Sequence, residues 1–458
     1  MLSGVGEQSP EGRSAPGAHG GPDVLLDPVE LHGSVTDPVL ASMTLLNDIV
    51  GRFPDAVSFA AGRPYEGFYA PESLARWLRL FERHLARDLG QGPEEIRRTL
   101  FQYGRTKGFI HRLIAAQLQQ DEALAVDAES VVVTTGCQEA MVLALRALRR
   151  DARDVVMAAL PAYVGFLGAA RLVDMPVRGV RENADGIDLD DLQRQIRLAR
   201  GEGLRPRACY VVPDFANPSG ASMPAAARER LVELAARDDL LLLEDNPYSL
   251  FHAGGGRLPT LKSLDRSRRV LYFGSFAKAA FAGGRVGYVV ADQPMTGGGL
   301  LADELAKLKS MLTLNTSTVA QAVIGGYLLE NDCSLVRATT REAAVYRRNL
   351  RAVLHGLEKR FEAGTGVCWN VPRGGMFTVL TVPFRADDAM LEYSAREFGV
   401  LWTPMHHFYG GRGGFRQLRL SFSVLEPDEI ERGLDRLAGL VADRTPVAQA
   451  AERFEPAG

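Results

Sequence analysis

The chain has 458 residues, of which 46% are hydrophobic, and its formal net charge is −3. This length is enough to bury a large core, and we expect one large and one smaller domain. The charge and the lack of a long Lys/Arg run argue against a nucleic-acid partner, and no apolar run reaches the length of a membrane span.

The cysteines and histidines argue against two kinds of site. The four cysteines are scattered without a CxxC pair. The eight histidines lack metal-ligand spacing, and only His406 and His407 are adjacent. We therefore expect neither a disulfide framework nor a metal site, and we predict a cytoplasmic protein of a reducing compartment.

The two ends of the chain differ in composition from the rest. Residues 1–30 are rich in Gly, Pro and Ser and lack the apolar segment of a secretory signal, so we expect a disordered tail there. Residues 445–458 are expected to form a second disordered tail. Residues 31–75 are expected to contribute to the smaller domain.

An alternation of strands and helices runs from about residue 130 to residue 291. Apolar strands are expected at 131–134, 154–160, 209–213, 240–245, 270–274 and 285–290. Helices between them include one that begins at 138 and one over 225–237. The strands are continuous apolar runs, which is typical of a sheet covered by helices on both faces. We expect a large α/β domain at 76–330 with a mostly parallel sheet.

A different pattern follows the large domain. Residues 301–360 are predicted to be helical and to lead out of it. Strands are expected at 368–372, 376–382 and 417–423, interleaved with helices near 388–398 and 429–443. This interleaving predicts a smaller α+β domain, which we place at 331–444.

Polar and aromatic side chains follow the ends of the expected strands, where ligands bind in open α/β sheets. Gly136, Cys137 and Gln138 follow the first strand and open a helix, so their backbone N–H groups suit a phosphate. Tyr163 follows the second strand and offers a ring that can stack on a planar heterocycle. Each of these features alone is also typical of an ordinary turn or of simple packing.

The next two strand ends add an amide, a carboxylate and a hydroxyl. Asn217 lies in an Asn-Pro turn and can hydrogen-bond a phenolic oxygen, although such turns also form for local reasons. Asp245 follows a run of leucines, where a buried carboxylate needs a partner such as a pyridinium N–H. Tyr248 lies three residues further on and can donate to an oxygen on the same ring.

After the fifth strand, Lys278 stands three residues after Ser275 and seven residues before Arg285. An amine, a hydroxyl and a guanidinium at this spacing suit a cofactor that carries an aldehyde and a phosphate. The amine forms a Schiff base, while the hydroxyl and the guanidinium hold the phosphate dianion. A lysine in a loop is usually a solvated surface residue, and the partners upstream are what favour the functional interpretation.

The ordered set at successive strand ends resembles the fold-type-I pyridoxal-phosphate enzymes of the aminotransferase class I/II superfamily, over about residues 31–440. The resemblance implies a seven-stranded, mostly parallel sheet covered by helices, with a smaller α+β C-terminal domain. It also implies pyridoxal 5′-phosphate as the cofactor. Lys278 would be the Schiff-base lysine, Asp245 the partner of the ring nitrogen, and Tyr248 with Asn217 the ligands of the ring hydroxyl. The remaining cofactor ligands that it implies are Gly136, Cys137, Gln138, Tyr163, Ser275 and Arg285.

The resemblance extends to a neighbouring subunit and to the substrate. Tyr103, in Phe-Gln-Tyr-Gly, resembles the tyrosine that reaches the phosphate of the other subunit, which implies a homodimer with shared active sites. Residues 31–75 would add dimer contacts. Arg419 matches the arginine that grips the substrate α-carboxylate, and Gly62 and Asn217 would be further substrate contacts.

Longer segments, at 58–68, 101–106, 210–214 and 399–405, look like the 3,5-dihydroxyphenylglycine transaminase group, which serves nonribosomal-peptide antibiotic biosynthesis. Two departures leave the substrate open. Phe281 and Ala282 precede a Gly-Gly pair where Pro-Gly is usual, and His406 and His407 stand where small or apolar residues are expected. These histidines are either a second acid/base group beside the substrate or exposed loop residues.

The sequence therefore predicts an aminotransferase that moves an amino group between an amino acid and a 2-oxo acid, with Lys278, Asp245 and Tyr248 as catalytic residues. The same cofactor also supports elimination, replacement, condensation and oxidation, and these alternatives stay open. A ligand-sensing regulator is disfavoured because the N-terminal region is short and not basic. A noncatalytic binding protein is disfavoured because Lys278 and Asp245 are both present.

Overall fold

A large sheet forms the centre of the protein in this computed structural model, which describes residues 25–254, 256–362 and 364–445. Its strands are β2 (Val131–Thr134), β3 (Asp154–Leu160), β4 (Val177–Asn183), β5 (Gly186–Ile187), β6 (Arg205–Val211), β7 (Leu241–Asp245), β8 (Val270–Ser275) and β9 (Gly287–Val290). They lie in the order β2-β9-β8-β7-β6-β3-β4-β5, and all neighbours from β8 to β4 are parallel. Strand β9 runs antiparallel to both of its neighbours.

The expected α/β class and the mostly parallel sheet are confirmed, but the number of strands differs from expectation. The sheet has eight strands rather than seven. The additional strand is the two-residue β5, which pairs antiparallel with the end of β4 and forms one edge of the sheet. A strand this short carries no periodicity from which the sequence predicts it.

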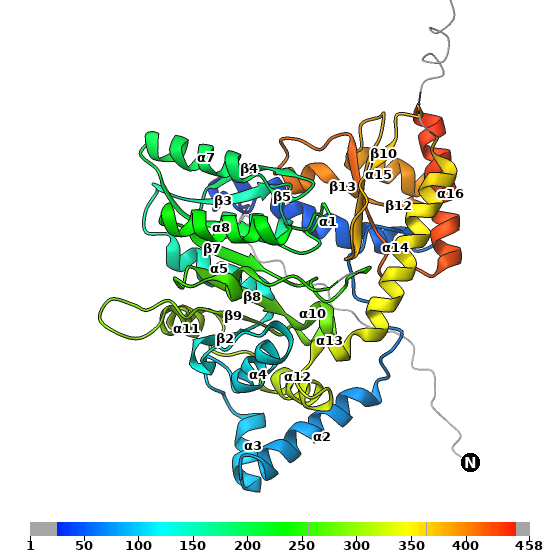
Figure 1. Ribbon diagram of the computed structural model, residues 1–458. Coiled ribbons are helices and arrows are strands. Elements are labelled where there is room, and N and C mark those ends of the chain that lie inside the picture. Colours follow the sequence, from blue (N-terminus) through cyan, green and yellow to red (C-terminus); the bar gives the residue numbers. More distant parts are fainter. Residues whose placement is uncertain (1–24, 255, 363, 446–458) are drawn as a thin grey trace, which may run out of the picture.

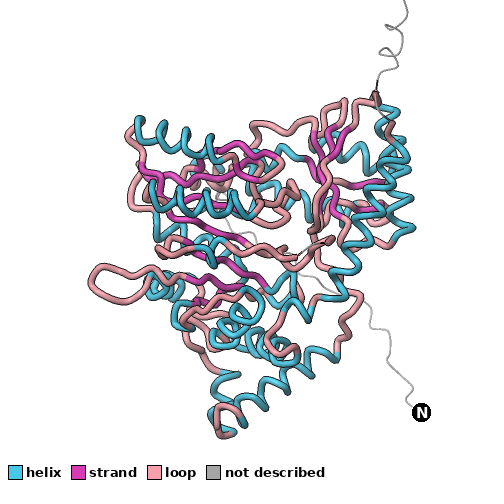
Figure 2. The backbone as a smooth tube through the Cα atoms, viewed as in Figure 1, coloured by secondary structure: helices cyan, strands magenta, loops and turns pink. Residues whose placement is uncertain are grey.

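Helices cover both faces of the sheet (Figures 1 and 2). One face packs against α5 (Gly136–Leu148), α6 (Val164–Leu172) and α11 (Leu301–Leu312). The other face packs against α7 (Leu189–Gly201), α8 (Ala225–Arg237), α4 (His111–Glu122) and α12 (Thr318–Glu330), and α2 (Glu72–Arg87) packs on α12. In β6, Ala208 and Tyr210 face α5 and α6, whereas Cys209 and Val211 face α7 and α8. Since successive strand residues point to opposite faces and both faces are buried, the strands are continuous apolar runs.

A second, smaller sheet lies beside the first (Figure 1). It is antiparallel, with the strand order β10 (Cys368–Trp369), β11 (Phe377–Thr381), β14 (Gln417–Ser421) and β13 (Thr403–Pro404). Its helices are α14 (Thr340–Arg360), α15 (Asp388–Tyr393) and α16 (Pro427–Arg444). The remaining α-helices are α1 (Pro38–Arg52), α3 (Pro93–Phe101), α9 (Leu261–Leu264), α10 (Phe276–Ala279) and α13 (Leu335–Ala338).

The N-terminal region packs with this smaller sheet. Strand β1 (Val57–Ser58) pairs parallel with β12 (Val400–Leu401). Ile49 and Phe59 are buried in the same hydrophobic core as Leu350 of α14 and Leu434 of α16. The chain segment that follows β1 is therefore anchored in the hydrophobic core of the smaller sheet and reaches the cavity described below.

Most of both expected tails, residues 1–24 and 446–458, lies outside the described residues. Residues 25–30 are described, and Pro28–Glu30 form the 3₁₀ helix η1, in which the N–H of Val29 donates to the Asp27 carboxylate at 2.9 Å. Among the described helices, none combines the length and the apolar character needed to cross a bilayer.

Candidate active site

One cavity of about 260 Å³ lies at the edge of the large sheet where the parallel strands end. Strand β9 is antiparallel to β8, so its beginning reaches the same edge and brings Arg285 close to Ser275. The expected site residues that line this cavity are Gly62, Cys137, Gln138, Tyr163, Asn217, Asp245, Tyr248, Ser275, Lys278, Arg285 and Arg419. Gly136 lies directly beside it, because a Cβ at that position would overlap Nη2 of Arg285.

Lys278 is partly buried near the end of α10. The first turn of this helix is capped by the Ser275 hydroxyl, which accepts from the N–H of Ala277 at 3.2 Å. The Lys278 ammonium donates to the carbonyl of Gly62. Burial lowers the pKa of Lys278 to about 8, and the positive charges of Arg419 and Arg285 contribute to this shift. An amine with this pKa is partly neutral near pH 7, so it can act as a nucleophile and as a base.

Asp245 is the last residue of β7 and is 5% exposed. The Tyr210 hydroxyl donates to its Oδ2 at 2.7 Å, and the Cys137 thiol donates to its Oδ1 at 3.7 Å. Burial raises the pKa of Asp245 to about 6, although both hydrogen bonds lower it. Within the described residues this carboxylate has no cationic partner, so a ligand that carries an N–H⁺ group would complete the site.

Arg419 is a buried guanidinium whose partners are all neutral. It donates to Asn217 Oδ1 at 2.6 Å, to the carbonyl of Ala60 at 2.8 Å and to the Thr403 hydroxyl at 3.1 Å. Its Nε is buried without a hydrogen-bond partner among the described residues. Burial lowers the pKa of Arg419 to about 10. A buried cation without a carboxylate partner suits an anionic ligand, and the planar guanidinium suits a carboxylate.

A second anion site lies at the N-terminus of α5. Thr135, the N-cap residue, makes no side-chain hydrogen bond to the helix, so the first N–H groups are available to a ligand. Gly136 has a φ of +73° and lies against the Arg285 guanidinium, where a side chain would not fit. The helix dipole and the guanidinium together suit a phosphate.

The cavity is therefore lined by two cationic sites, at Arg285 and at Arg419, together with an amine and a carboxylate. Burial raises the pKa of Tyr163 to about 12 and holds the pKa of Tyr248 far above its ordinary value, so both hydroxyls stay protonated and can donate. The shape and charge fit pyridoxal 5′-phosphate, which has a phosphate, a basic ring nitrogen and an aldehyde. The site at Arg419 is then left for a second, carboxylate-bearing molecule.

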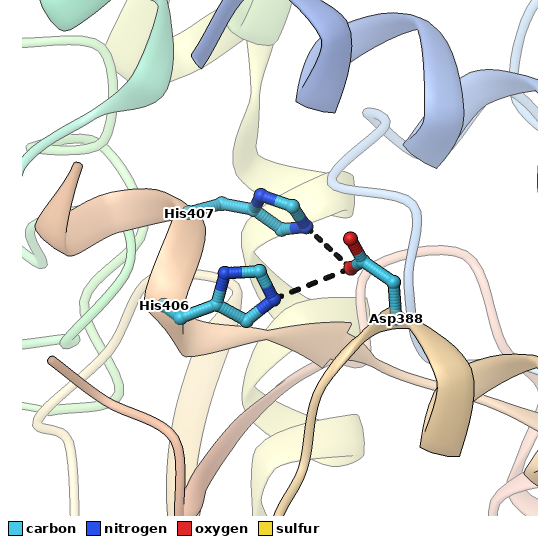
Figure 3. A group of neighbouring side chains, drawn as sticks. All are labelled: Asp388, His406 and His407. Atoms are coloured by element: carbon cyan, nitrogen blue, oxygen red, sulfur yellow. Dashed lines mark hydrogen bonds and ion pairs between the residues drawn. The ribbon is translucent and has the colours of Figure 1, made fainter. Parts of the chain in front are cut away.

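The histidine pair lies elsewhere. His406 and His407 belong to the 3₁₀ helix η5 (Met405–Tyr409), and both side chains face Asp388 (Figure 3). Of the described η5 residues, Phe408 alone lines the cavity. The histidines are therefore neither an acid/base group in this cavity nor exposed, since their side chains are 12% and 7% accessible. Tyr103 also lies outside the cavity of its own chain and is 83% exposed.

Three residues that contact the site residues were not predicted from the sequence. Tyr210 lies inside β6 rather than at its end, and its signal is the strand register, since it pairs with Leu243, two residues before Asp245. Ala60 and Thr403 act through a backbone carbonyl and a hydroxyl on segments far from Arg419 in the chain. No local pattern marks either of them.

Comparison with known proteins agrees with this geometry. Residues 78–437 match the sequence model of the family described as aminotransferase class I and II. The (S)-3,5-dihydroxyphenylglycine transaminase of Amycolatopsis orientalis is 55% identical over 414 residues, which are 90% of this chain and 94% of that protein.

Two solved structures share the fold. A kynurenine aminotransferase of Pyrococcus horikoshii in complex with PMP has a TM-score of 0.76 and 26% identity, and the match covers 87% of this chain and 94% of that one. An α-aminoadipate aminotransferase of Thermus thermophilus, complexed with N-(5′-phosphopyridoxyl)-L-leucine, has a TM-score of 0.73 and 28% identity, over 89% of this chain and 97% of that one. The chain thus belongs to the aminotransferase class I and II family, with pyridoxal 5′-phosphate as its cofactor and an amino acid and a 2-oxo acid as its substrates.

Proposed function

We propose that one substrate pair of this aminotransferase is an arylglycine and the matching aryl-glyoxylate, and that the reaction serves the biosynthesis of a specialised metabolite such as a peptide antibiotic. The observation that carries the proposal is the 55% identity to a (S)-3,5-dihydroxyphenylglycine transaminase. That match spans 90% of this chain and so extends well beyond the cofactor motif.

The cavity wall near Arg419 supports a flat, apolar substrate side chain. Met141, Val164 and Phe408 line the cavity, and the Phe408 ring lies 5.1 Å from the guanidinium carbon of Arg419. The aromatic ring of an arylglycine is attached directly to Cα. A carboxylate held by Arg419 therefore places that ring within reach of Phe408, where aromatic packing is favourable.

The cationic site at Arg285 orients the cofactor. Arg285, Ser275 and the first N–H groups of α5 would hold its phosphate, and Lys278 would hold its aldehyde carbon. Asp245 would pair with its ring nitrogen at the other side of the ring. When bound, pyridoxal phosphate supplies an electron sink for charge that develops at the substrate Cα. The other residues proposed to hold the ring are Tyr163, Asn217 and Tyr248.

The charge states of the chain's own groups support this assignment. Lys278, with a pKa of about 8, can accept a proton from the substrate Cα and return it. Asp245, with a pKa of about 6, is ionised above that pH and loses its charge as the pH falls below it. Arg419 stays charged throughout this range and fixes the substrate carboxylate.

We also propose a homodimer in which Tyr103 of one subunit completes the phosphate site of the other. Tyr103 and Phe101 are 83% and 80% exposed, and Met311 at the end of α11 is 86% exposed. The loop after α3 lies close to the start of α12, because the Thr318 hydroxyl donates to the carbonyl of Leu100 at 2.7 Å. Large side chains with this degree of exposure are typical of a protein interface.

A single-turnover experiment tests the substrate. The purified holoenzyme is mixed with one amino acid at a time, without any 2-oxo acid, and the cofactor and products are followed by absorbance and mass spectrometry. We expect an arylglycine to convert the cofactor to its amine form and to release one equivalent of the aryl-glyoxylate, faster than phenylalanine, leucine or glutamate react. Conversion by those amino acids with no reaction of any arylglycine would refute the substrate proposal and leave the family assignment intact.

The same experiment addresses the alternative reactions. In transamination the cofactor ends in its amine form, and a second 2-oxo acid restores the aldehyde. Elimination, replacement, condensation and oxidation instead return the cofactor as the aldehyde after each turnover. Repeated turnover of an amino acid without any 2-oxo acid would therefore contradict transamination as the main reaction.

A further inference from the structure

Two imidazoles and one carboxylate meet on the smaller sheet's side of the molecule, outside the cofactor cavity (Figure 3). Asp388 is the first residue of α15, and His406 and His407 belong to η5. The Asp388 Oδ1 atom lies 2.7 Å from Nε2 of His407 and 3.3 Å from Nε2 of His406. One ligand atom from each of the three residues lies within 4.8 Å of the other two.

One of the two imidazoles in this cluster has no hydrogen-bond partner among the described residues. His407 forms a hydrogen bond with Asp388, but Nε2 of His406 is buried and has no hydrogen-bond partner among the described residues. His406 stacks on Phe415, with ring centroids 5.3 Å apart, and its centroid lies 4.0 Å from that of the tilted His407 ring. A buried imidazole nitrogen that lies at ion-pair distance from a carboxylate oxygen, without the geometry of a hydrogen bond, is a place where an ion can bind.

We propose that Asp388, His406 and His407 bind one divalent cation of the zinc type. Two imidazoles and one carboxylate, with a water in the remaining position, are a common set for Zn²⁺ and also suit Co²⁺ and Ni²⁺. Mg²⁺ and Ca²⁺ favour oxygen ligands and are disfavoured here.

The distances are compatible with such an ion. Ligand bonds of about 2.0–2.2 Å in a tetrahedral site place neighbouring ligand atoms roughly 3.3–3.5 Å apart. The 3.3 Å separation between Asp388 and His406 meets this, and the 2.7 Å separation between Asp388 and His407 needs a small side-chain adjustment. A cavity of about 330 Å³ borders the cluster, lined also by Pro38 and Ser42 of α1, and leaves room for water ligands.

The site has a direct link to the cofactor cavity through η5. Phe408 follows His407, and its carbonyl accepts from the N–H of Ala162 at 2.9 Å, next to Tyr163. The Phe408 ring lines the cavity beside Arg419. A bound cation joins η5 to α15 and thereby holds the loop that carries Phe408, so the cation has a structural role and takes no part in the reaction.

The test uses the tag-free holoenzyme, first dialysed against a chelator and then against chelator-free buffer, in the absence of amino acids. Zinc is titrated by calorimetry, and bound metal is counted by mass spectrometry. We expect one zinc per chain with a dissociation constant in the micromolar range or tighter. The D388N, H406N and H407N variants are each expected to bind at least tenfold more weakly. The matched control is H355N, which removes an exposed histidine from α14 and should bind zinc as the wild type does.

A second measurement needs no variant. Cobalt is added to the wild-type holoenzyme, and its visible absorption reports whether nitrogen and oxygen ligands surround it in a low-coordinate site. Zinc should then displace the cobalt and remove the absorption. The proposal is overturned if the wild-type enzyme binds no zinc, or if binding persists undiminished in all three ligand variants.

Discussion

The hydroxyl of Tyr210 is expected to control the charge of Asp245, and Tyr210→Phe removes that hydroxyl alone. It donates to the Asp245 carboxylate at 2.7 Å, and the phenylalanine ring can keep the stacking with Phe166, whose centroid lies 3.8 Å away. A hydrogen bond to a charged group contributes about 1.5–3 kcal/mol. Since one pKa unit corresponds to about 1.36 kcal/mol, its loss raises the pKa of Asp245 by about 1–2 units.

The sign of the effect follows from the ionised form of Asp245. The carboxylate pairs with the ring nitrogen only when it is charged, and its pKa in the cofactor-free protein is already raised to about 6. In Tyr210→Phe this group is therefore about half to nine-tenths protonated at pH 7 in the cofactor-free protein. We expect cofactor affinity to fall by about 2- to 10-fold at pH 7 and by about 5- to 50-fold at pH 6, with almost no loss at pH 9.

The assay is a cofactor titration of the apoenzyme at pH 6 to 9, together with kcat/KM for the amino acid over the same range. The matched control is Tyr288→Phe, which removes another buried hydroxyl, bonded to Gln117 at 3.3 Å, without contacting the cavity. The acid limbs of the two pH profiles, of cofactor affinity and of kcat/KM, should move to higher pH in Tyr210→Phe and stay in place in Tyr288→Phe. An unmoved acid limb with cofactor affinity within twofold of the wild type would refute the reasoning.

Three other substitutions probe the two anion sites and the subunit contact. Arg419→Ala should lower kcat/KM for an amino acid by about 100-fold or more, because the charge-assisted pair between the guanidinium and the substrate carboxylate is lost. An arylmethylamine has no carboxylate, so its kcat/KM should barely change. Equal losses for both substrates would contradict the role of Arg419 as the carboxylate site. Gly136→Ala should weaken cofactor binding at least tenfold, since its Cβ would collide with Arg285, whereas Gly168→Ala, with nothing within 4 Å, should bind the cofactor normally. Tyr103→Phe should weaken cofactor binding only in the dimer. A cofactor titration measures the affinity, and sedimentation of the same samples reports whether the protein is a dimer or a monomer. An effect of equal size in a monomer would exclude a role of Tyr103 across the interface.

The residues that were predictable from the sequence share one property: they follow the ends of strands. Parallel strands end at the same edge of a sheet, so Tyr163, Asn217, Asp245 and Lys278 come together once the strands are recognised. The continuous apolar runs made those strands recognisable, because both faces of the sheet are buried. For this reason the fold class and the composition of the cavity followed from local patterns.

The features that escaped prediction depend on contacts between distant segments. Tyr210 meets Asp245 only through the pairing of β6 with β7, and the residues around it, from Cys209 to Val212, form a continuous apolar run. The burial of His406 and His407 depends on where α15 places Asp388, which no spacing in η5 reveals. Strand β5 was missed because two residues are too few for a periodic signal. Strand β4 was also not among the expected strands, because its largely polar sequence, Val-Arg-Gly-Val-Arg-Glu-Asn, is unlike the continuous apolar runs of the others.

The way Arg419 is held has a consequence for how substrates come and go. Its guanidinium is already occupied by three neutral oxygens, from Asn217 in the large sheet's region, Ala60 in the N-terminal segment and Thr403 in the smaller sheet. Three of the five N–H groups are thus used by the chain, and an arriving carboxylate meets the two that remain, on Nε and Nη1. The three internal hydrogen bonds hold the guanidinium in one position before and after each acid binds, which suits an enzyme that must admit and release two different acids at one arginine in every catalytic cycle.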